Sequence, residues 1–449
     1  MASDDRPSAL LVGVTDPYMI RACLKNDIKP VVFHGPDMGD WGYVRLPDGV
    51  ESVFAEDPKD AECLISAIHR ADLDTREYLC VQSTDEFAQV SAAALAVHLG
   101  VAGIDSHTAV RFRDKWLQKR YVREAGLDTA GSRVIDDVFA PGALAPFEAE
   151  GIGKSVLKPV AGAGTMNTVV VSDLEDLRAR LAQFRRDGVH QRTFVLEEFV
   201  DGEEWVADGV VFEGRVQFFA LGAYGKPCLS VVSANKTLQM ERFDPVADQE
   251  LYEAAEPVVT GVLSALRLER GVFHMELFRQ AGTGRIYFSE VAVRRGGALT
   301  QEEIEYKFGV DLSEAGLLCA AGRDPRVKPT VRPEAVGMTY LLNRGGTLMS
   351  CPTLAEIQAR PGVRYARLEL PLGFQIPEHL TNTIGKVGQA VVSGARREEL
   401  FARRDDLARW FDDNLVVAPA NVTIRELRDW QAANWPDRDS RFQTFAPAI

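Results

Sequence analysis

The sequence predicts a mixed α/β protein with more than one domain, and three observations lead to this fold class. Strand-like and helical runs alternate over the first hundred residues, from the apolar run at 9–15 to the helical run at 85–100, and this alternation is typical of a parallel sheet. Two later strand-like runs, at 271–278 and 285–292, are joined by a turn-rich Ala-Gly-Thr-Gly and predict an antiparallel hairpin. The chain of 449 residues is long enough for two to four domains.

Composition excludes several classes of function. The apolar fraction of 46% supports real cores, and 51 basic against 65 acidic residues give a net charge of −14. No basic cluster is long enough to follow a phosphate backbone, so a nucleic-acid partner is not expected. We find neither a signal-peptide pattern nor an apolar run that could span a bilayer, so we expect a cytoplasmic protein without a membrane partner. The six cysteines form no C-x-x-C pair and are expected to be reduced thiols.

The hairpin carries the most informative residues, Glu276 and Glu290. An odd loop would place the two carboxylates opposite each other on one face, whereas an even loop would turn them to opposite faces. Alternation would add His274, Ala292 and Arg294 to the same face. Mg²⁺ with phosphate oxygens would neutralise such a face, because Mg²⁺ is commonly held by one or two carboxylates together with substrate phosphates. A solvated hairpin with a Glu/Arg pair is the alternative.

A glycine-rich turn between two strands supplies a candidate phosphate site. Lys154 and Lys158 lie on the strand that leads into Gly162, Ala163, Gly164 and Thr165. Glycines let backbone N–H groups approach a phosphate, and Lys158 adds a cation at the strand end. A flexible hairpin tip beside a surface lysine would have the same sequence.

Two further segments flank this turn. A single helix that begins at Asp105 or Ser106 and runs through Val122 is expected to carry Lys115. The acidic turn at 194–209 follows an apolar strand, and it could offer backbone groups to an adenine edge while Glu204 accepts from ribose hydroxyls. A solvated acidic turn is the alternative for this second segment.

Taken in order, these pieces resemble the ATP-grasp superfamily, from about residue 8 to 420. The ordered signals are Asp114-Lys115, Lys154 and Lys158 before a glycine loop, E-E-F-V-x-G-x-E, H-x-E and E-x-A-x-R-x-G-G. Within that superfamily the ending is most similar to the L-amino-acid ligases. The resemblance implies an ATP-grasp fold with an N-terminal parallel α/β domain, a small lid subdomain and a large C-terminal antiparallel-sheet lobe. The implied divisions are 1–105, a core at 106–323 with the lid at 132–196, a lobe at 324–420 and an extension at 421–449.

Residue by residue, the resemblance implies roles for the motif positions. ATP phosphates would contact Lys115 and Lys158 beneath a lid loop at 161–168, which includes Gly162, Ala163, Gly164 and Thr165. Glu197 would accept from the adenine amino group, Glu198, Phe199 and Val200 would give backbone contacts, and Glu204 would hold the ribose. The metal residues would be Glu276 and Glu290, holding two Mg²⁺ ions, with Mn²⁺ as a substitute. The catalytic set would be Arg294, His274 and Lys236.

Ala292 departs from the family pattern, because many ATP-grasp enzymes have Asn there, and the second metal ion is then less fully ligated. The implied activity is ATP-dependent joining of an amino acid or small carboxylic acid to an amine or amino acid through an acyl phosphate. Its partners are small-molecule acid and amine substrates, neither of which the sequence identifies, and a homodimer is left open. A bicarbonate-activating carboxylase or carbamoyl-phosphate type enzyme and a non-catalytic nucleotide sensor are the competing interpretations.

Overall fold

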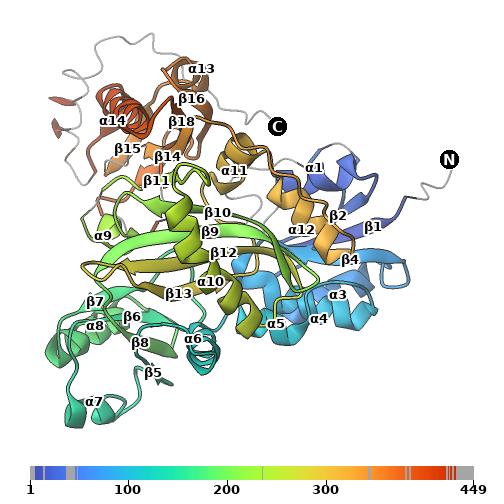
Figure 1. Ribbon diagram of the computed structural model, residues 1–449, viewed down its shortest axis with the longest axis horizontal. Helices are drawn as coiled ribbons and strands as arrows, with labels where there is room; N and C mark the ends of the chain where they lie inside the picture. Colours follow the sequence, from blue (N-terminus) through green and yellow to red (C-terminus); the bar gives the residue numbers. More distant parts are fainter. Residues whose placement is uncertain are drawn as a thin grey trace.

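The computed structural model contains three lobes arranged around one large sheet (Figure 1). It describes residues 6–13, 16–36, 46–47, 49–234, 236–341, 345–379, 382–383, 386–420, 423, 425–426 and 429–430. Most of the expected C-terminal extension at 421–449 therefore lies outside the described residues. The predicted fold class is confirmed, because a parallel sheet, a small antiparallel unit and a large antiparallel sheet are all present.

The N-terminal lobe is a parallel sheet in the order β3-β2-β1-β4 with helices packed against it. Its strands are β1 (Ser8–Val12), β2 (Lys29–His34), β3 (Glu51–Phe54) and β4 (Tyr78–Ser83), and its helices are α1 (Pro17–Lys25), α3 (Ala61–Arg70), η1 (Glu86–Ala88) and α4 (Gln89–Leu99). Helix α12 (Leu312–Ala320) packs between this lobe and the central sheet. The strand-helix alternation of the sequence therefore forms the parallel sheet that it predicts.

The helix expected from 105 through Val122 is wrong, because the chain breaks it in two. Helix α5 (Ser106–Arg111) ends before α6 (Lys115–Glu124) begins. The break has a local cause, since the Asp114 carboxylate accepts from the N–H of Leu117 at 2.9 Å and starts a new helix. The Lys115 N–H donates to the Val160 carbonyl at 2.8 Å, which fixes the start of α6 beside the glycine-rich turn.

A four-stranded antiparallel sheet in the order β5-β8-β6-β7 forms the small lobe. Its elements are β5 (Ser132–Ile135), α7 (Ala145–Glu150), β6 (Ser155–Pro159), β7 (Val169–Val171), α8 (Leu174–Arg186) and β8 (Phe194–Glu198). Leu157, Leu177, Phe184 and Phe194 are buried together as its own core. The glycine-rich turn joins β6 to β7 at the open edge of this lobe.

The central sheet has eight strands in the order β13-β12-β9-β10-β11-β14-β18-β16. Its strands are β9 (Gly202–Phe212), β10 (Arg215–Tyr224), β11 (Gln239–Arg242), β12 (Arg270–Gln280), β13 (Ile286–Ala292), β14 (Ala335–Leu341), β16 (Val363–Leu368) and β18 (Gly388–Gly394). Helices α6 and α10 (Gln249–Ala265) pack on one face, against residues such as Phe273 and Met275. Helices α11 (Thr300–Phe308) and α12 cover part of the other face, where Val210 and Val272 lie.

The C-terminal strands complete this sheet and carry a second, smaller one. The small sheet has the order β17-β15-β19, and the lobe is closed by two helices. Its elements are β15 (Gly346–Ser350), α13 (Leu354–Gln358), β17 (Gln375–Ile376), α14 (Arg397–Asp413) and β19 (Val416–Ala418), while α9 (Cys228–Ser233) lies between β10 and β11. The segment at 230–244 contains both the end of helix α9 and strand β11. Among the described residues, no helix combines the length and apolar character that crossing a bilayer requires.

The β12–β13 hairpin places Glu276 directly opposite Glu290, as expected, but not for the expected reason. Gln280 bonds to Arg285 across a four-residue turn, and an even turn by itself would separate the two carboxylates. The register shifts by one residue between the pairs Leu277–Phe288 and Glu276–Glu290, which leaves Ser289 as a bulge. Phe288 therefore joins the core under α10, whereas Glu290 turns to the opposite face.

Candidate functional site

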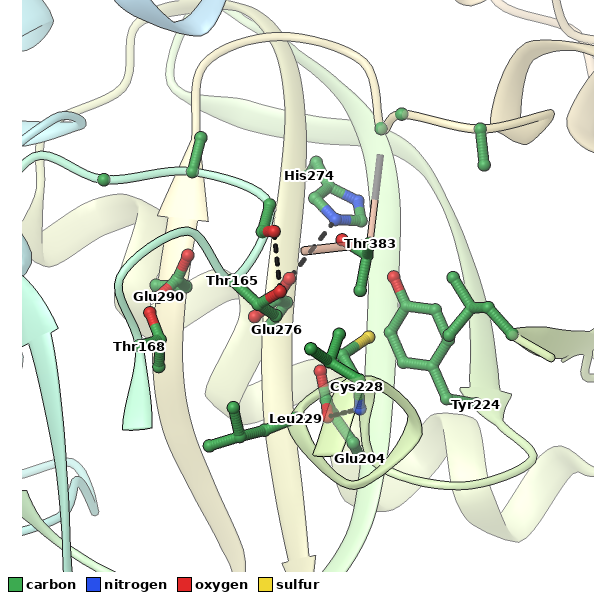
Figure 2. Close-up of a pocket in the computed structure, with 18 of the residues that line it drawn as sticks. Thr165, Thr168, Glu204, Tyr224, Cys228, Leu229, His274, Glu276, Glu290 and Thr383 are labelled. Carbon is green, nitrogen blue, oxygen red and sulfur yellow. Dashed lines mark hydrogen bonds and ion pairs between the residues drawn. The ribbon is translucent and has the colours of Figure 1, made fainter. Parts of the chain in front are cut away.

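One cavity of about 1780 Å³ lies where the three lobes meet the central sheet. Its floor is the sheet face that carries Glu204, His274, Glu276 and Glu290, and its other walls come from all three lobes (Figure 2). Glu290 follows β13 from the bulge, and Glu276 lies on β12. Period-two alternation explains the floor, because Phe273 and Met275 turn toward α10 while their even-numbered neighbours face the cavity.

Two lysines hold the second carboxylate of the pair. Lys115 Nζ lies 3.2 Å from Glu290 Oε1, and Lys158 Nζ lies 3.0 Å from Glu290 Oε2. Burial alone would raise the pKa of Glu290, but the charges of Lys115 and Lys158 outweigh it and hold this pKa well below its usual range. The carboxylates of Glu197 and Glu290 raise the pKa of Lys158 against its burial, so Lys158 and Glu290 both stay charged.

A third lysine, Lys119, lies one helical turn after Lys115 on α6. Its side chain is 1% exposed, and its Nζ donates to the Ser289 carbonyl at 2.8 Å. Glu197 Oε2 lies 3.3 Å from Lys119 Nζ and 3.2 Å from Lys158 Nζ. Burial lowers the pKa of Lys119 to about 8. The other carboxylate oxygen of Glu197, Oε1, is buried and has no hydrogen-bond partner in the described structure, so an acceptor is left open at the cavity wall.

The acidic turn lines the cavity from Glu197 to Glu204. Glu198 is exposed, and its carboxylate accepts from the Gly131 N–H at 3.2 Å. The ammonium nitrogen of Lys154 lies over the ring of Phe199, 3.5 Å from the ring centre. Glu204 is buried, and its Oε2 accepts from the Cys228 N–H at 2.8 Å. Burial, together with the charge of Glu276, raises the pKa of Glu204 to about 8. Glu204 therefore binds a proton more readily than an ordinary carboxyl group, and its protonated form can donate a hydrogen bond as well as accept one.

The glycine-rich turn covers the lysines. Lys115 Nζ donates to the Gly162 carbonyl at 2.9 Å, and the Thr383 N–H donates to the Gly164 carbonyl at 3.1 Å. Gly164 and Thr165 both have φ of 60°, a left-handed conformation that favours glycine. Gly162, Ala163, Gly164 and Thr165 all line the cavity, so the turn lies where the sequence places a lid.

A buried ion network fixes His274. His274 Nδ1 lies 2.7 Å from Asp208 Oδ1, and Arg242 bonds to the same carboxylate at 2.8 Å. Arg242 also bonds to Glu303 at 3.2 Å, and the side chains of Asp208, Arg242 and Glu303 are completely buried. Burial alone would lower the pKa of His274, but Asp208 raises it to about 9, so the ring is protonated at neutral pH. Its Nε2 lies 3.8 Å from Glu276 Oε1.

Arg294 lies beyond the end of β13, so the expectation that it shares the strand face of Glu290 is wrong. Its position is set instead by a carboxylate of the N-terminal lobe, because its Nε lies 2.5 Å from Glu86 Oε2. Arg113 pairs with the same carboxylate and donates to the Ala161 carbonyl of the glycine-rich turn. Glu86 therefore connects Arg294 to the turn, and Arg294 still lines the cavity.

Comparison with known proteins now decides the family. Residues 154–303 match the model of the ATP-grasp domain. The chain is 25% identical over 300 residues to an L-arginine-specific L-amino acid ligase of Bacillus subtilis, covering 66% of this chain and 69% of that protein. Residues 154–303 therefore form an ATP-grasp domain, and the chain is similar to an L-amino acid ligase over 66% of its length. It is also 27% identical over 214 residues to mouse carnosine synthase 1, across 45% of this chain and 25% of that larger protein.

The ATP-grasp fold extends over nearly the whole chain. The crystal structure of an L-amino acid ligase from Bacillus licheniformis superposes with a TM-score of 0.73 and 20% identity, covering 93% of this chain and 99% of that one. The fold of the C-terminal strands is therefore shared with that structure as well as the fold of residues 154–303. The family resemblance expected from the sequence motifs is confirmed.

In this ATP-grasp chain, the cavity brings together all the site residues expected from the sequence except one. Lys236 is exposed and is not among the described residues that line the cavity. Four residues that the sequence analysis missed are part of the site or support it: Glu86, Arg113, Asp208 and Arg242. Only Asp208 carried a usable signal, because a carboxylate in the middle of the apolar strand Trp-Val-Ala-Asp-Gly-Val-Val is costly to bury without a partner.

The donors of the ATP-grasp cavity fit Mg²⁺ with phosphate rather than a metal held by protein alone. In the described parts of the chain, no three His, Cys, Asp or Glu side chains gather closely enough to hold an ion. Glu276 and Glu290 face each other, and Ala292 adds no oxygen. Two carboxylates beside two lysines suit an ion whose remaining ligands are phosphate oxygens and water. The unpartnered Glu197 Oε1 likewise fits a ligand that donates a hydrogen bond.

Proposed function

We propose that this protein is an ATP-dependent carboxylate-amine ligase that joins an amino acid or small carboxylic acid to an amine or a second amino acid. One observation carries the proposal: the facing pair Glu276 and Glu290 shares a cavity with Lys115, Lys158 and Arg294. Similarity to an L-amino acid ligase and to carnosine synthase supports amide formation as the reaction. The products are the amide, ADP and phosphate.

The nucleotide takes the end of the cavity under the glycine-rich turn. Lys115 and Lys158 bind its phosphates, and the turn at 161–168 closes over them. The open Oε1 of Glu197 accepts from the adenine amino group, which a carboxylate with a free acceptor can do. Backbone groups of 198–200 complete the adenine contacts, and Glu204 bonds to the ribose hydroxyls.

Glu276 and Glu290 hold Mg²⁺, which when bound neutralises the phosphate charge during phosphoryl transfer. The carboxylate oxygen of the acid substrate attacks the γ-phosphorus, and the bond to the ADP oxygen breaks. The amine nitrogen then attacks the acyl carbon, the carbon-oxygen bond to phosphate breaks, and the amine loses a proton. Arg294 stabilises the negative charge that develops on the acyl oxygens.

His274 acts in this scheme as a hydrogen-bond donor rather than as the base. Asp208 keeps the ring protonated at neutral pH, and a protonated imidazole cannot accept the proton of the amine. Its Nε2 faces Glu276, where a carboxylate or phosphate oxygen of the intermediate would lie.

Phosphate release from Mg²⁺-ATP, measured with the protein L-amino acids singly and in pairs, tests the proposal. Release should require an acid and an amine together, and mass spectrometry should detect the amide. ATP turnover that depends on bicarbonate without any amino acid would instead favour the carboxylase alternative. Tight ATP binding without turnover under any condition would favour the sensor.

A further inference from the structure

Strand β13, which carries Glu290, is the edge of the central sheet as the structure describes it. One side of the strand bonds to β12, and the other side presents backbone N–H and C=O groups that no further strand pairs. Val291 is 2% exposed and Ser289 is 7% exposed, so little water reaches these groups. A buried edge of this kind needs donors and acceptors from another element.

Helix α6 supplies them, because it packs beside β13 (Figure 1). The Gln118 side-chain amide accepts from the Val291 N–H at 3.0 Å and donates to the Val291 carbonyl at 2.9 Å. The next residue, Lys119, donates to the Ser289 carbonyl at 2.8 Å. Gln118 and Lys119 are each 1% exposed. The Gln118 amide therefore bonds to the edge of the sheet in the way that a neighbouring strand would.

These bonds lie at the bulge that decides which way Glu290 points. In a regular strand Phe288 and Glu290 would share a face, because successive side chains alternate. Phe288 is buried in the core under α10, yet Glu290 lines the cavity, and the bulged Ser289 lies between them. Packing of Phe288 fixes the chain before the bulge, and Gln118 fixes it directly after Glu290. Both anchors are needed to keep the extra residue at this position.

Gln118 and Lys119 differ in what else they contact. Lys119 Nζ also lies 3.3 Å from Glu197 Oε2, so a change of Lys119 would disturb the proposed adenine contact as well. The side-chain hydrogen bonds of Gln118 go to Val291 alone among the residues that the structure describes, and Gln118 is not one of those that line the cavity. A change of Gln118 therefore separates an effect on Glu290 from a direct effect on the nucleotide.

On this basis, and given the proposed function in which Glu290 holds Mg²⁺, we propose that Gln118 is a positioning residue for the metal site. Its two hydrogen bonds hold β13 in the bulged register, and this register turns Glu290 toward Glu276. Lys119 supports the same register through the carbonyl of the bulged residue. Helix α6 thus orients a metal-binding carboxylate through the backbone of β13, without any contact between Gln118 and the metal or the nucleotide.

The test measures nucleotide binding and strand structure separately from turnover. Gln118→Met keeps the length of the side chain and removes both hydrogen bonds. The dissociation constant of a nonhydrolysable ATP analogue in Mg²⁺, measured by calorimetry, should rise about tenfold or more, the scale for losing a group that orients a metal ligand. The dissociation constant of the same analogue in EDTA should not change. Hydrogen exchange of the peptide that contains Val291, followed by mass spectrometry, should become faster.

Two variants serve as controls. Arg120 is exposed on the same helix and pairs locally with Glu124, so Arg120→Met should match the wild type in every measurement. Ile68 is buried in the separate core of the N-terminal lobe. Ile68→Ala should lower the melting temperature without changing the effect of Mg²⁺ on binding, and it therefore shows what a loss of stability does by itself.

The proposal fails if folded Gln118→Met keeps the wild-type affinity for the analogue in Mg²⁺, or if Ile68→Ala loses as much of that affinity. It also fails if Gln118→Met binds the analogue equally weakly in Mg²⁺ and in EDTA only because binding in EDTA has weakened too. If Gln118→Met does not fold, Gln118→Asn, whose amide is one methylene shorter, is measured against the same outcomes. A wild type whose affinity for the analogue is the same in Mg²⁺ and in EDTA would instead refute the metal role of Glu276 and Glu290 in the proposed function.

Discussion

Arg294 shows at the scale of one residue how the site is assembled from distant segments. Its position depends on Glu86, 208 residues earlier in the chain, and not on the regular strand that precedes it. Glu86 is held ionised, because Arg294, Arg113 and Lys115 outweigh the burial that would raise its pKa. A carboxylate that is charged and bonded to two guanidinium groups restricts the orientation of both.

Replacing Arg294 by Ala tests its assigned role. Turnover should fall by about a hundredfold or more, the scale for a lost oxyanion donor, because its permanent charge stabilises an anion that grows during the reaction. The dissociation constant for ATP, measured by calorimetry, should change little. Lys158→Ala provides the contrast, since it should weaken ATP binding itself. Near-normal amide formation by Arg294→Ala would place the wrong residue at the centre of the mechanism.

The pKa of His274 depends on how closely the chain packs around it. A Cβ at Gly296 would lie 2.8 Å from both His274 Nδ1 and Asp208 Oδ1, whereas a Cβ at Gly297 would meet nothing within 4 Å. Gly296→Ala should therefore separate the pair and lower the His274 pKa from about 9 toward its ordinary 6.5. Gly297→Ala is the matched control and should leave the titration unchanged, as followed by NMR of the ring.

The sign of the stability effect follows from the raised pKa. The charged His274-Asp208 pair contributes fully below pH 6.5, and this contribution is lost as the pH rises through about 9. The free energy of unfolding of Gly296→Ala, measured with denaturant, should therefore fall less between pH 6.5 and about 9 than that of the wild type. Identical pH profiles for the two proteins would contradict the link between packing and charge.

At the scale of elements, the glycine-rich turn is held by contacts that ATP would replace. Lys115 bonds to both Gly162 and Glu290, and Thr383 bonds to Gly164. When phosphates take Lys115 and Lys158, the turn should order over them, because a covering loop must open for exchange and close for reaction. Amide hydrogen exchange at 161–168 should slow on addition of a nonhydrolysable ATP analogue with Mg²⁺.

The hairpin turn at 281–284 serves as the internal control, since it is exposed and does not line the cavity. Its exchange should not change. Unaltered exchange in both turns, with binding confirmed by calorimetry, would show that the glycine-rich turn is not a lid.

At the scale of the whole molecule, local patterns predicted the elements better than the contacts between them. The sequence predicted the parallel sheet, the small lobe's strands and the facing pair Glu276 and Glu290. It did not predict the bulge at Ser289, which depends on how the hairpin packs under α10. Nor could it place Glu86 beside Arg294, because no periodicity relates residues that meet only when two lobes dock.

The boundaries between lobes also depend on contacts between distant segments, which local sequence patterns do not predict. The resemblance implies a division at 323, yet β14 pairs with β11 and β18 pairs with β14 in one continuous sheet. Val206 and Met240 from the core are buried in the same cluster as Val336, Met338 and Val391. The residues after 323 therefore complete the core sheet in addition to forming a lobe of their own.

Truncation after residue 323 tests this interdependence. The fragment 1–323 would leave β11 as an unpaired edge beside a half-exposed apolar cluster, and such edges promote association. It should aggregate or melt without a cooperative transition, and it should not bind ATP, although the proposed nucleotide residues all lie before 323. Circular dichroism, light scattering and calorimetry measure these properties. A monomeric fragment that melts cooperatively and binds ATP with the affinity of the full chain would mean that the first 323 residues fold independently, because the burial of Met240 and Val206 would then not require β14 and β18.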